Sequence, residues 1–200
     1  MKRWIILIAA AVALAACSPR KYAINQIGKL LSGSGSTFSA DSDPELIRSA
    51  VPFSLKLIES LLAEAPQHEG LLLAASRGFT QYAFAFVMQD ADELDAKDRA
   101  AAQAARARAA KLFLRARDYG LRGLALKRAN LAAQLKENPK AEVASMTSKD
   151  VPFLYWTSVA WAGALVSSRD MFMLPEIPRF EAMIERALEL DEAFDAGAIR

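Results

Sequence analysis

Cysteine and histidine, the residues that most often carry reaction chemistry, occur once each in this chain, as Cys17 and His68. A Ser–His–Asp or Cys–His catalytic site would have to use His68, which lies just after Pro66 in a segment expected to be a loop. One histidine and one cysteine are too few for a typical zinc site, and the sequence has no glycine-rich phosphate loop. The sequence therefore predicts no catalytic residue, no metal site, no cofactor and no enzymatic activity.

The surroundings of Cys17 indicate a different chemistry, the attachment of lipid. Lys2 and Arg3 form a basic start, residues 4–13 are all apolar, and residues 14–17 are Leu-Ala-Ala-Cys. This order is typical of a secretory signal, and the apolar run is too short to span a bilayer. We predict a lipoprotein signal peptide over residues 1–16, cleavage before Cys17, and a membrane anchor on its sulfur. The alternative is a plain secreted protein in which Cys17 occurs by chance. With a single cysteine, the chain has no internal disulfide under either interpretation.

The charge balance argues against nucleic acid as a partner. The full chain has 25 Lys+Arg against 23 Asp+Glu. Lys2 and Arg3 leave with the signal, so the mature chain carries 23 of each sign. The basic isoelectric point therefore belongs to the signal.

Residues 17–40 are expected to join the lipid to the folded body. An aspartate after the lipidated cysteine usually retains a Gram-negative lipoprotein in the inner membrane. Ser18 in that position favours the outer membrane, facing the periplasm. Tyr22–Leu31 has the spacing of a short helix, and Gly33–Thr37 (Gly-Ser-Gly-Ser-Thr) has the composition of a flexible linker.

Residues 41–200 are expected to form one all-α domain. Asp43 and Pro44 are typical of a helix start, and apolar residues then recur at spacings of three and four. Strand-like alternation is absent. Further helices are predicted over Glu69–Met88, Ala96–Leu126, Pro152–Ser168 and Pro178–Leu190.

Two segments match half of a tetratricopeptide repeat loosely. The first match comprises Ser54, Ile58, Leu61 and Pro66, followed by Leu72, Ala75, Ser76 and Phe79; the second comprises Phe180, Ile184, Ala187 and Glu192. Their separation does not fit a regular repeat. We therefore expect irregular tetratricopeptide-like stacked helical hairpins. The second match lacks its following helix, so we also expect the domain to be truncated at the C-terminus.

A basic stripe marks the third predicted helix. Arg108, Lys111, Arg115 and Arg122 fall along one side of it. The functional interpretation is a face for an acidic partner or ligand. The alternative, which we favour, is a solvated helix face, with Leu112, Ala116, Tyr119 and Gly123 packed on the opposite side.

The stretch Val151–Ser168 carries no charge, yet it is too short and too rich in hydroxyl side chains for a membrane span. A helix apolar on every side is usually the buried centre of a helical domain, and Gly78–Met88 is its expected packing partner. The aromatic residues of these segments could instead line an apolar ligand channel. The residues assigned to this core or channel are Phe79, Tyr82, Tyr155, Trp156 and Trp161.

Four segments in this order resemble the T component of TRAP transporters, the TatT family of periplasmic lipoproteins. They are Asp41–Phe79, Ala110–Leu124, Asp150–Leu165 and Met183–Arg200, and they cover nearly the whole mature chain. The resemblance implies a lipid-anchored, tetratricopeptide-like helical protein that forms homotrimers with openings through the protomers. It also implies association with a periplasmic solute-binding protein and a non-enzymatic role in solute uptake. The residue that carries over is Cys17, as the lipid site.

Two functions follow from these observations. The first is an accessory and binding subunit of a TRAP-type uptake system that docks a solute-binding protein. The alternative is a general tetratricopeptide-like scaffold lipoprotein for envelope assembly. An enzyme using His68 is a distant third.

Overall fold

The computed structural model describes Ile24, residues 26–28, Leu30 and residues 41–199. The predicted signal peptide, Cys17 and the Gly33–Thr37 linker lie outside the described residues. The α-helices are α4 (Pro44–Glu64), α5 (Glu69–Tyr82), α6 (Gln89–Asp95), α7 (Arg99–Ala125), α8 (Leu131–Glu137), α9 (Pro139–Ala144), α10 (Val151–Ser168), α11 (Ile177–Leu190) and α12 (Phe194–Gly197). A π-helix, η1 (Ala83–Met88), and two 3₁₀ helices, η2 (Ser148–Asp150) and η3 (Met171–Glu176), complete the order. The part of the chain that is described contains no strand, which confirms the all-α class.

The first hairpin follows from local sequence signals. The Asp43 carboxylate accepts hydrogen bonds from the backbone N–H groups of Glu45 and Leu46, at 3.1 and 3.0 Å, and so caps α4. Pro44 occupies the first turn, where a missing N–H costs nothing. One face of α4 buries Leu55, Ile58 and Leu62 against α5. The predicted helix start is therefore confirmed.

The second helical column is longer than predicted. We expected it to end at Met88, but α5, η1 and α6 run on without a break to Asp95. The segment after Met88 is too polar to suggest a buried helix. It is held because Ala91 is fully buried and because Arg106 of α7 pairs with Asp92 and Asp95. The column is long and apolar enough to cross a membrane by composition, but its apolar side chains form part of the core.

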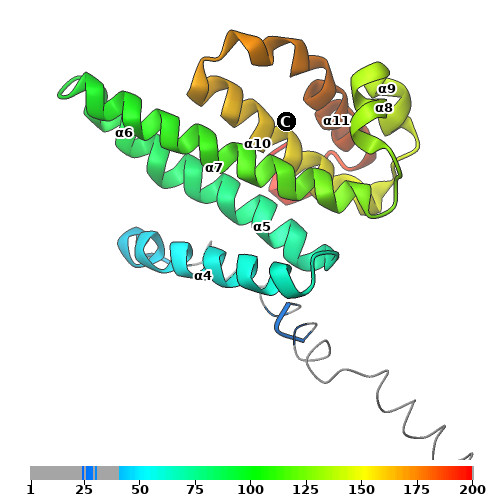
Figure 1. Ribbon diagram of the computed structural model, residues 1–200, viewed down its shortest axis with the longest axis horizontal. Helices are drawn as coiled ribbons and strands as arrows, with labels where there is room; N and C mark the ends of the chain where they lie inside the picture. Colours follow the sequence, from blue (N-terminus) through cyan, green and yellow to red (C-terminus); the bar gives the residue numbers. More distant parts are fainter. Residues whose placement is uncertain (1–23, 25, 29, 31–40, 200) are drawn as a thin grey trace, which may run out of the picture.

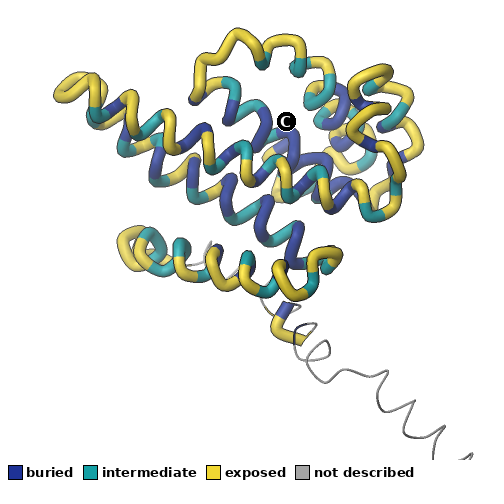
Figure 2. The backbone as a smooth tube through the Cα atoms, in the orientation of Figure 1, coloured by how far each residue is buried: buried dark blue, intermediate teal, exposed yellow. Residues whose placement is uncertain are grey.

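The uncharged helix α10 lies at the centre of the domain, between α7 and α11 (Figure 1). Figure 2 shows its chain dark blue along most of its length, as expected for a buried helix. The segment Gly78–Met88 does contact α10, since Ala83 and Val87 share a cluster with Ala164, but α10 packs most extensively on α7. Gly120 and Gly123 of α7 explain this preference. A Cβ atom at Gly120 would lie 2.0 Å from Thr157 Oγ1, and one at Gly123 would lie 2.0 Å from the Phe153 ring.

The segment between α7 and α10 contains two short helices that the sequence did not predict. Asn130 adopts a left-handed conformation with φ of 64°, and Asn138 caps α9 through the N–H of Ala141. Asp150 ends the segment by accepting hydrogen bonds from Thr147 and from the Arg128 guanidinium. These are polar contacts, so hydrophobic periodicity gave no sign of them. Whether the α4–α5 and α10–α11 pairs follow a tetratricopeptide register stays a prediction.

Candidate functional site

The aromatic residues assigned to a core or channel are packed in the domain interior. Phe79, Tyr155, Trp156 and Trp161 are buried, and Tyr82 is half-buried against the same core. Phe79 stacks on Tyr119 at 6.0 Å, and Tyr155 contacts Trp156 edge-on at 4.9 Å. A separate apolar hollow of about 230 Å³ between α10 and α11 is lined by other residues, Val159, Phe180 and Ile184 among them. The packing of the five assigned aromatic residues in the interior favours the core interpretation over the channel.

Trp161 is held from three sides. Its Nε1–H donates a 2.7 Å hydrogen bond to Glu176 Oε2. The guanidinium groups of Arg117 and Arg179 lie 5.1 and 6.0 Å from its ring, and both also pair with Glu176. A tryptophan with its N–H satisfied and two cations near its ring is a structural anchor between α7, α10 and η3.

A second polar network joins α4 to α7 beside the basic stripe. The Tyr119 hydroxyl donates a 2.8 Å hydrogen bond to Glu59, which also pairs with Lys56 at 2.6 Å and with Arg115 at 3.5 Å. Burial and the adjacent Glu59 carboxylate raise the pKa of Tyr119 to about 12. Burial alone would raise the pKa of Glu59, but the hydrogen bonds and charges of its partners outweigh it, so this pKa is lowered. Glu59 is therefore an ionised acceptor at neutral pH and Tyr119 a protonated donor, and their hydrogen bond joins α4 to α7.

Two hollows lie next to each other on α7. The larger, of about 710 Å³, lies between the first half of α7 and the end of α10. The smaller, of about 380 Å³, lies beside the second half of α7. Lys111 and Leu114 line both, so the two hollows are neighbours, and we call them together the α7 furrow. Its charged lining consists of Asp95, Arg99, Arg106, Lys111, Arg115, Asp118, Arg122 and Arg169.

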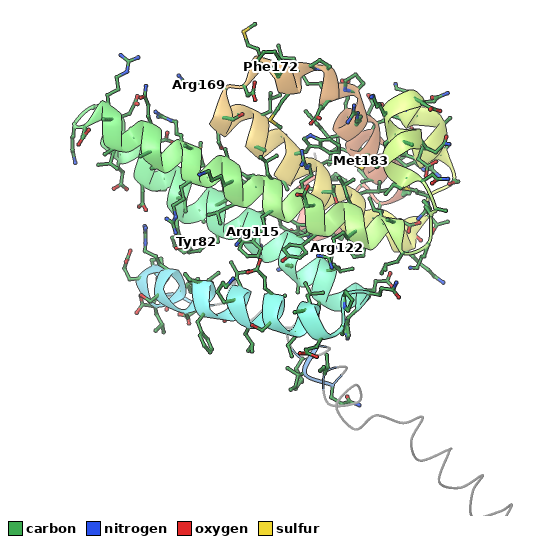
Figure 3. The ribbon with its side chains drawn as sticks, in the orientation of Figure 1. Tyr82, Arg115, Arg122, Arg169, Phe172 and Met183 are labelled. Carbon is green, nitrogen blue, oxygen red and sulfur yellow. The ribbon has the colours of Figure 1, made fainter. Side chains whose placement is uncertain are left out.

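The furrow gathers three of the four predicted stripe residues. Lys111, Arg115 and Arg122 line it, and Figure 3 shows Arg115 and Arg122. Arg108 does not line it, and its guanidinium lies 5.9 Å from the Tyr82 ring. We expected Tyr119 to pack on the side opposite the stripe, and this was wrong. Arg122 lies 5.2 Å from the Tyr119 ring, because residues three and four apart on a helix are neighbours.

The stripe residues also differ in how many contacts they form with other parts of the domain. Arg115 pairs with Glu59 and lies 5.3 Å from the Phe79 ring. Arg122 donates a hydrogen bond to the Pro66 carbonyl oxygen at 3.1 Å. Lys111 is exposed and forms no ion pair with any described residue. Lys111 is thus the stripe cation that is available to a partner.

The furrow includes cations that the stripe did not predict. Arg99 and Arg106 lie about three turns and about one turn before Lys111 on α7, and Arg169 comes from the end of α10. Arg106 pairs with Asp92 and Asp95. Arg99 and Arg169 form no ion pair within the described part of the chain, although both lie near Asp95. The spacing of Arg99, Gln103 and Arg106 could have indicated their shared face, but no sequence signal points to Arg169.

His68 has a structural role. Its Nδ1 accepts a 3.1 Å hydrogen bond from the backbone N–H of Leu71, which caps α5. The described residues contain no group of three His, Cys, Asp or Glu side chains that could hold a metal ion. His68 is therefore placed where it stabilises a helix start.

The described residues form an all-α domain with charged hollows along α7. The sequence model of the TRAP transporter T-component family (TAtT) matches residues 40–200, so the chain belongs to that family, as its sequence segments suggested. The family is named for a component of TRAP transporters.

The chain is also similar to a curated protein of greater length. An uncharacterized protein of Treponema pallidum (strain Nichols) is 29% identical over 167 residues, which cover 81% of this chain and 52% of that protein. The chain spans about half the length of that curated relative.

Proposed function

We propose that this chain is the lipid-anchored periplasmic subunit of a TRAP-type uptake system and that it docks the system's solute-binding protein through the α7 furrow. Family membership supports the transport role. The signal at residues 1–16 and Cys17 support anchoring by lipid, with the outer membrane favoured by Ser18. The subunit acts by binding and not by catalysis.

The observation that carries the docking proposal is the set of free cations in the furrow. Arg99, Lys111 and Arg169 line a hollow of about 710 Å³ on a rigid helical frame. Charged groups of this kind raise the rate of encounter with a partner of opposite charge, and salt weakens the effect. An acidic surface on the solute-binding protein would therefore associate rapidly at low ionic strength.

The decisive experiment measures association and dissociation rates between the purified solute-binding protein and the lipid-free chain from Ser18 onward. Lys111→Glu and Arg99→Glu should lower the association rate about three- to tenfold at low salt and leave the dissociation rate within about twofold. Lys149→Glu is the matched control. Lys149 is exposed, forms no ion pair with a described residue, and lies at the other end of α10 from the furrow.

Arg115 and Arg122 are less suitable for this test, because both also hold the fold together. Absence of binding at low and moderate salt, together with capture of envelope-assembly proteins, would replace the transport role by the scaffold role.

Cys17→Ser should leave the precursor uncleaved and without lipid, as mass spectrometry would show. The mass of the detergent-solubilised protein tests the homotrimer that the resemblance implies.

A further inference from the structure

The connection between α10 and α11 exposes an unusual amount of apolar side chain. Phe172 is 93% exposed and Met171 is 76% exposed, and Val166 and Leu174 beside them in sequence are also exposed. Figure 3 shows Phe172 at the outer edge of the domain, close to Arg169. We call Met171 and Phe172 the η3 knob. Phenylalanine, methionine and arginine are enriched at the centres of protein interfaces.

The η3 knob is held in place by its own polar contacts. The Asp170 carboxylate accepts a 2.9 Å hydrogen bond from the backbone N–H of Phe172, and Ser168 Oγ accepts one from the N–H of Asp170 at 3.2 Å. Met173, the next residue, packs inward against both hydrophobic clusters of the domain. The two exposed side chains therefore project from a fixed turn, which reduces the entropy lost when a partner binds them.

The first described segment (blue, residues 24 to 30 with gaps) lies on the opposite side of the domain from η3 (Figure 1). Ile24 is buried in the core, and Gly28 approaches His68 and Leu71 at the start of α5. Ile24 follows Cys17 by seven positions, and seven residues reach at most about 25 Å. A lipid on Cys17 would thus hold the membrane near the α4–α5 turn, so the η3 knob faces away from it.

The charge around the η3 knob indicates the chemistry of its partner. Arg169 adopts a left-handed conformation with φ of 51° at the end of α10 and lines the large hollow of the α7 furrow with Arg99 and Lys111. An apolar side chain beside unpaired cations is complementary to an apolar pocket with acidic groups on its rim.

We propose that the η3 knob inserts into an apolar pocket with an acidic rim on the solute-binding protein, and so forms the anchor of the docking surface. This inference rests on the proposed function, which supplies the partner. The furrow cations then set the rate of encounter, and the η3 knob sets the lifetime of the complex.

The first test compares dissociation rates of the solute-binding protein from the wild-type chain and from Met171→Ser/Phe172→Ser. The double variant should dissociate about tenfold faster or more, with an association rate within about twofold of wild type. Phe53→Ser is the matched control, since Phe53 is 73% exposed and belongs to α4, which lies on the opposite side of the domain from η3 (Figure 1). Unchanged thermal melting of both variants would show that the fold is retained.

The second test places a photo-crosslinking amino acid at position 172 in the membrane-anchored protein in cells. Crosslinking to the solute-binding protein, identified by mass spectrometry, supports the inference. Crosslinking to lipid, to a second copy of this chain or to nothing overturns it. Wild-type binding that the double variant leaves unchanged overturns the inference alone, whereas absence of wild-type binding overturns the proposed function with it.

Discussion

The buried side and the solvent-exposed side of α7 differ in the kind of residue that they present. The side facing α10 presents small or apolar residues, among them Phe113, Ala116, Gly120 and Gly123, all of them buried. The solvent-exposed side of α7 carries charges such as Arg99 and Lys111, which line the α7 furrow. Burial and close packing determine stability on the first side, while solvated charges on the second add little to it. Stability and partner binding should therefore be separable along one helix.

The largest expected effect on stability is in the core that the buried side of α7 faces, at Trp161 of α10. Trp161→Ala should lower the free energy of unfolding by about 3–5 kcal/mol, because it removes a buried ring and its contacts with Arg117 and Glu176. Trp161→Phe, which keeps a ring, is the control and should lose less. Denaturant unfolding measures both. A loss below about 1 kcal/mol for the alanine variant would mean that the ring faces a cavity, and would restore the channel interpretation.

Gly123 tests the close approach of α7 to α10 directly. Gly123→Ala places a methyl group in contact with the Phe153 ring, and overpacking of this kind costs about 1–3 kcal/mol. That cost should exceed the helix propensity of about 1 kcal/mol gained by alanine over glycine. Phe153→Leu should partly relieve the clash, so a double-mutant cycle should show positive coupling. Purely additive losses would contradict the proposed contact.

Asp150, which binds Arg128 just after α7, should contribute a pH dependence. Burial would raise its pKa, but the hydrogen bonds from Thr147 and Arg128 and the charge of Arg128 outweigh burial, so the pKa is lowered. A carboxyl group whose pKa is lowered by folding stabilises the protein above its unfolded pKa of about 4, and this contribution is lost as the pH falls through the folded pKa.

Asp150→Asn should therefore cost about 1–3 kcal/mol at neutral pH and reduce the loss of stability in acid. Thermal melting from about pH 7 down to about pH 2 measures this, since the loss begins near the unfolded pKa of about 4 and continues below it. Glu59, whose pKa is also lowered, should leave part of the acid dependence in place. Asp92→Asn is the exposed control. A variant with the same acid profile as wild type would show that Asp150 is not the titrating group.

The smallest expected effect on stability is in the furrow. Lys111→Glu should change the free energy of unfolding by less than about 0.5 kcal/mol, because Lys111 is exposed and forms no ion pair with a described residue. The same variant is expected to slow association with the solute-binding protein. A large loss of stability would show that the two sides of α7 are coupled, and would contradict the expectation that stability and partner binding can be changed separately.

Much of the fold could be predicted because its signals are local. Asp43 and Pro44 marked the start of α4, and the uncharged composition of α10 indicated its burial. The predicted bounds of α10 and α11 differ from the observed ones by one residue at their starts. The polar helices α8 and α9 were missed because they bury few residues and depend on turn geometry at Asn130 and Asn138.

The furrow was only partly predictable. Helical spacing placed Lys111, Arg115 and Arg122 on one face, and the structure keeps them together. Spacing could not separate Arg115, which binds Glu59 of α4, from Lys111, which stays free. The difference depends on a helix more than forty residues earlier in the chain, so no pattern within α7 contains it.

The sequence by itself determined the helical class, the buried centre and the family, because periodicity, uncharged composition and segment order are properties of neighbouring residues. Only the tertiary structure decided that α7 is the main partner of α10, that Arg169 joins Arg99 and Lys111, and that Phe172 projects from a fixed turn. These facts depend on how distant helices approach one another. That approach is set by side-chain volume at the crossing points, such as Gly120 and Gly123, which a pattern along one helix does not specify.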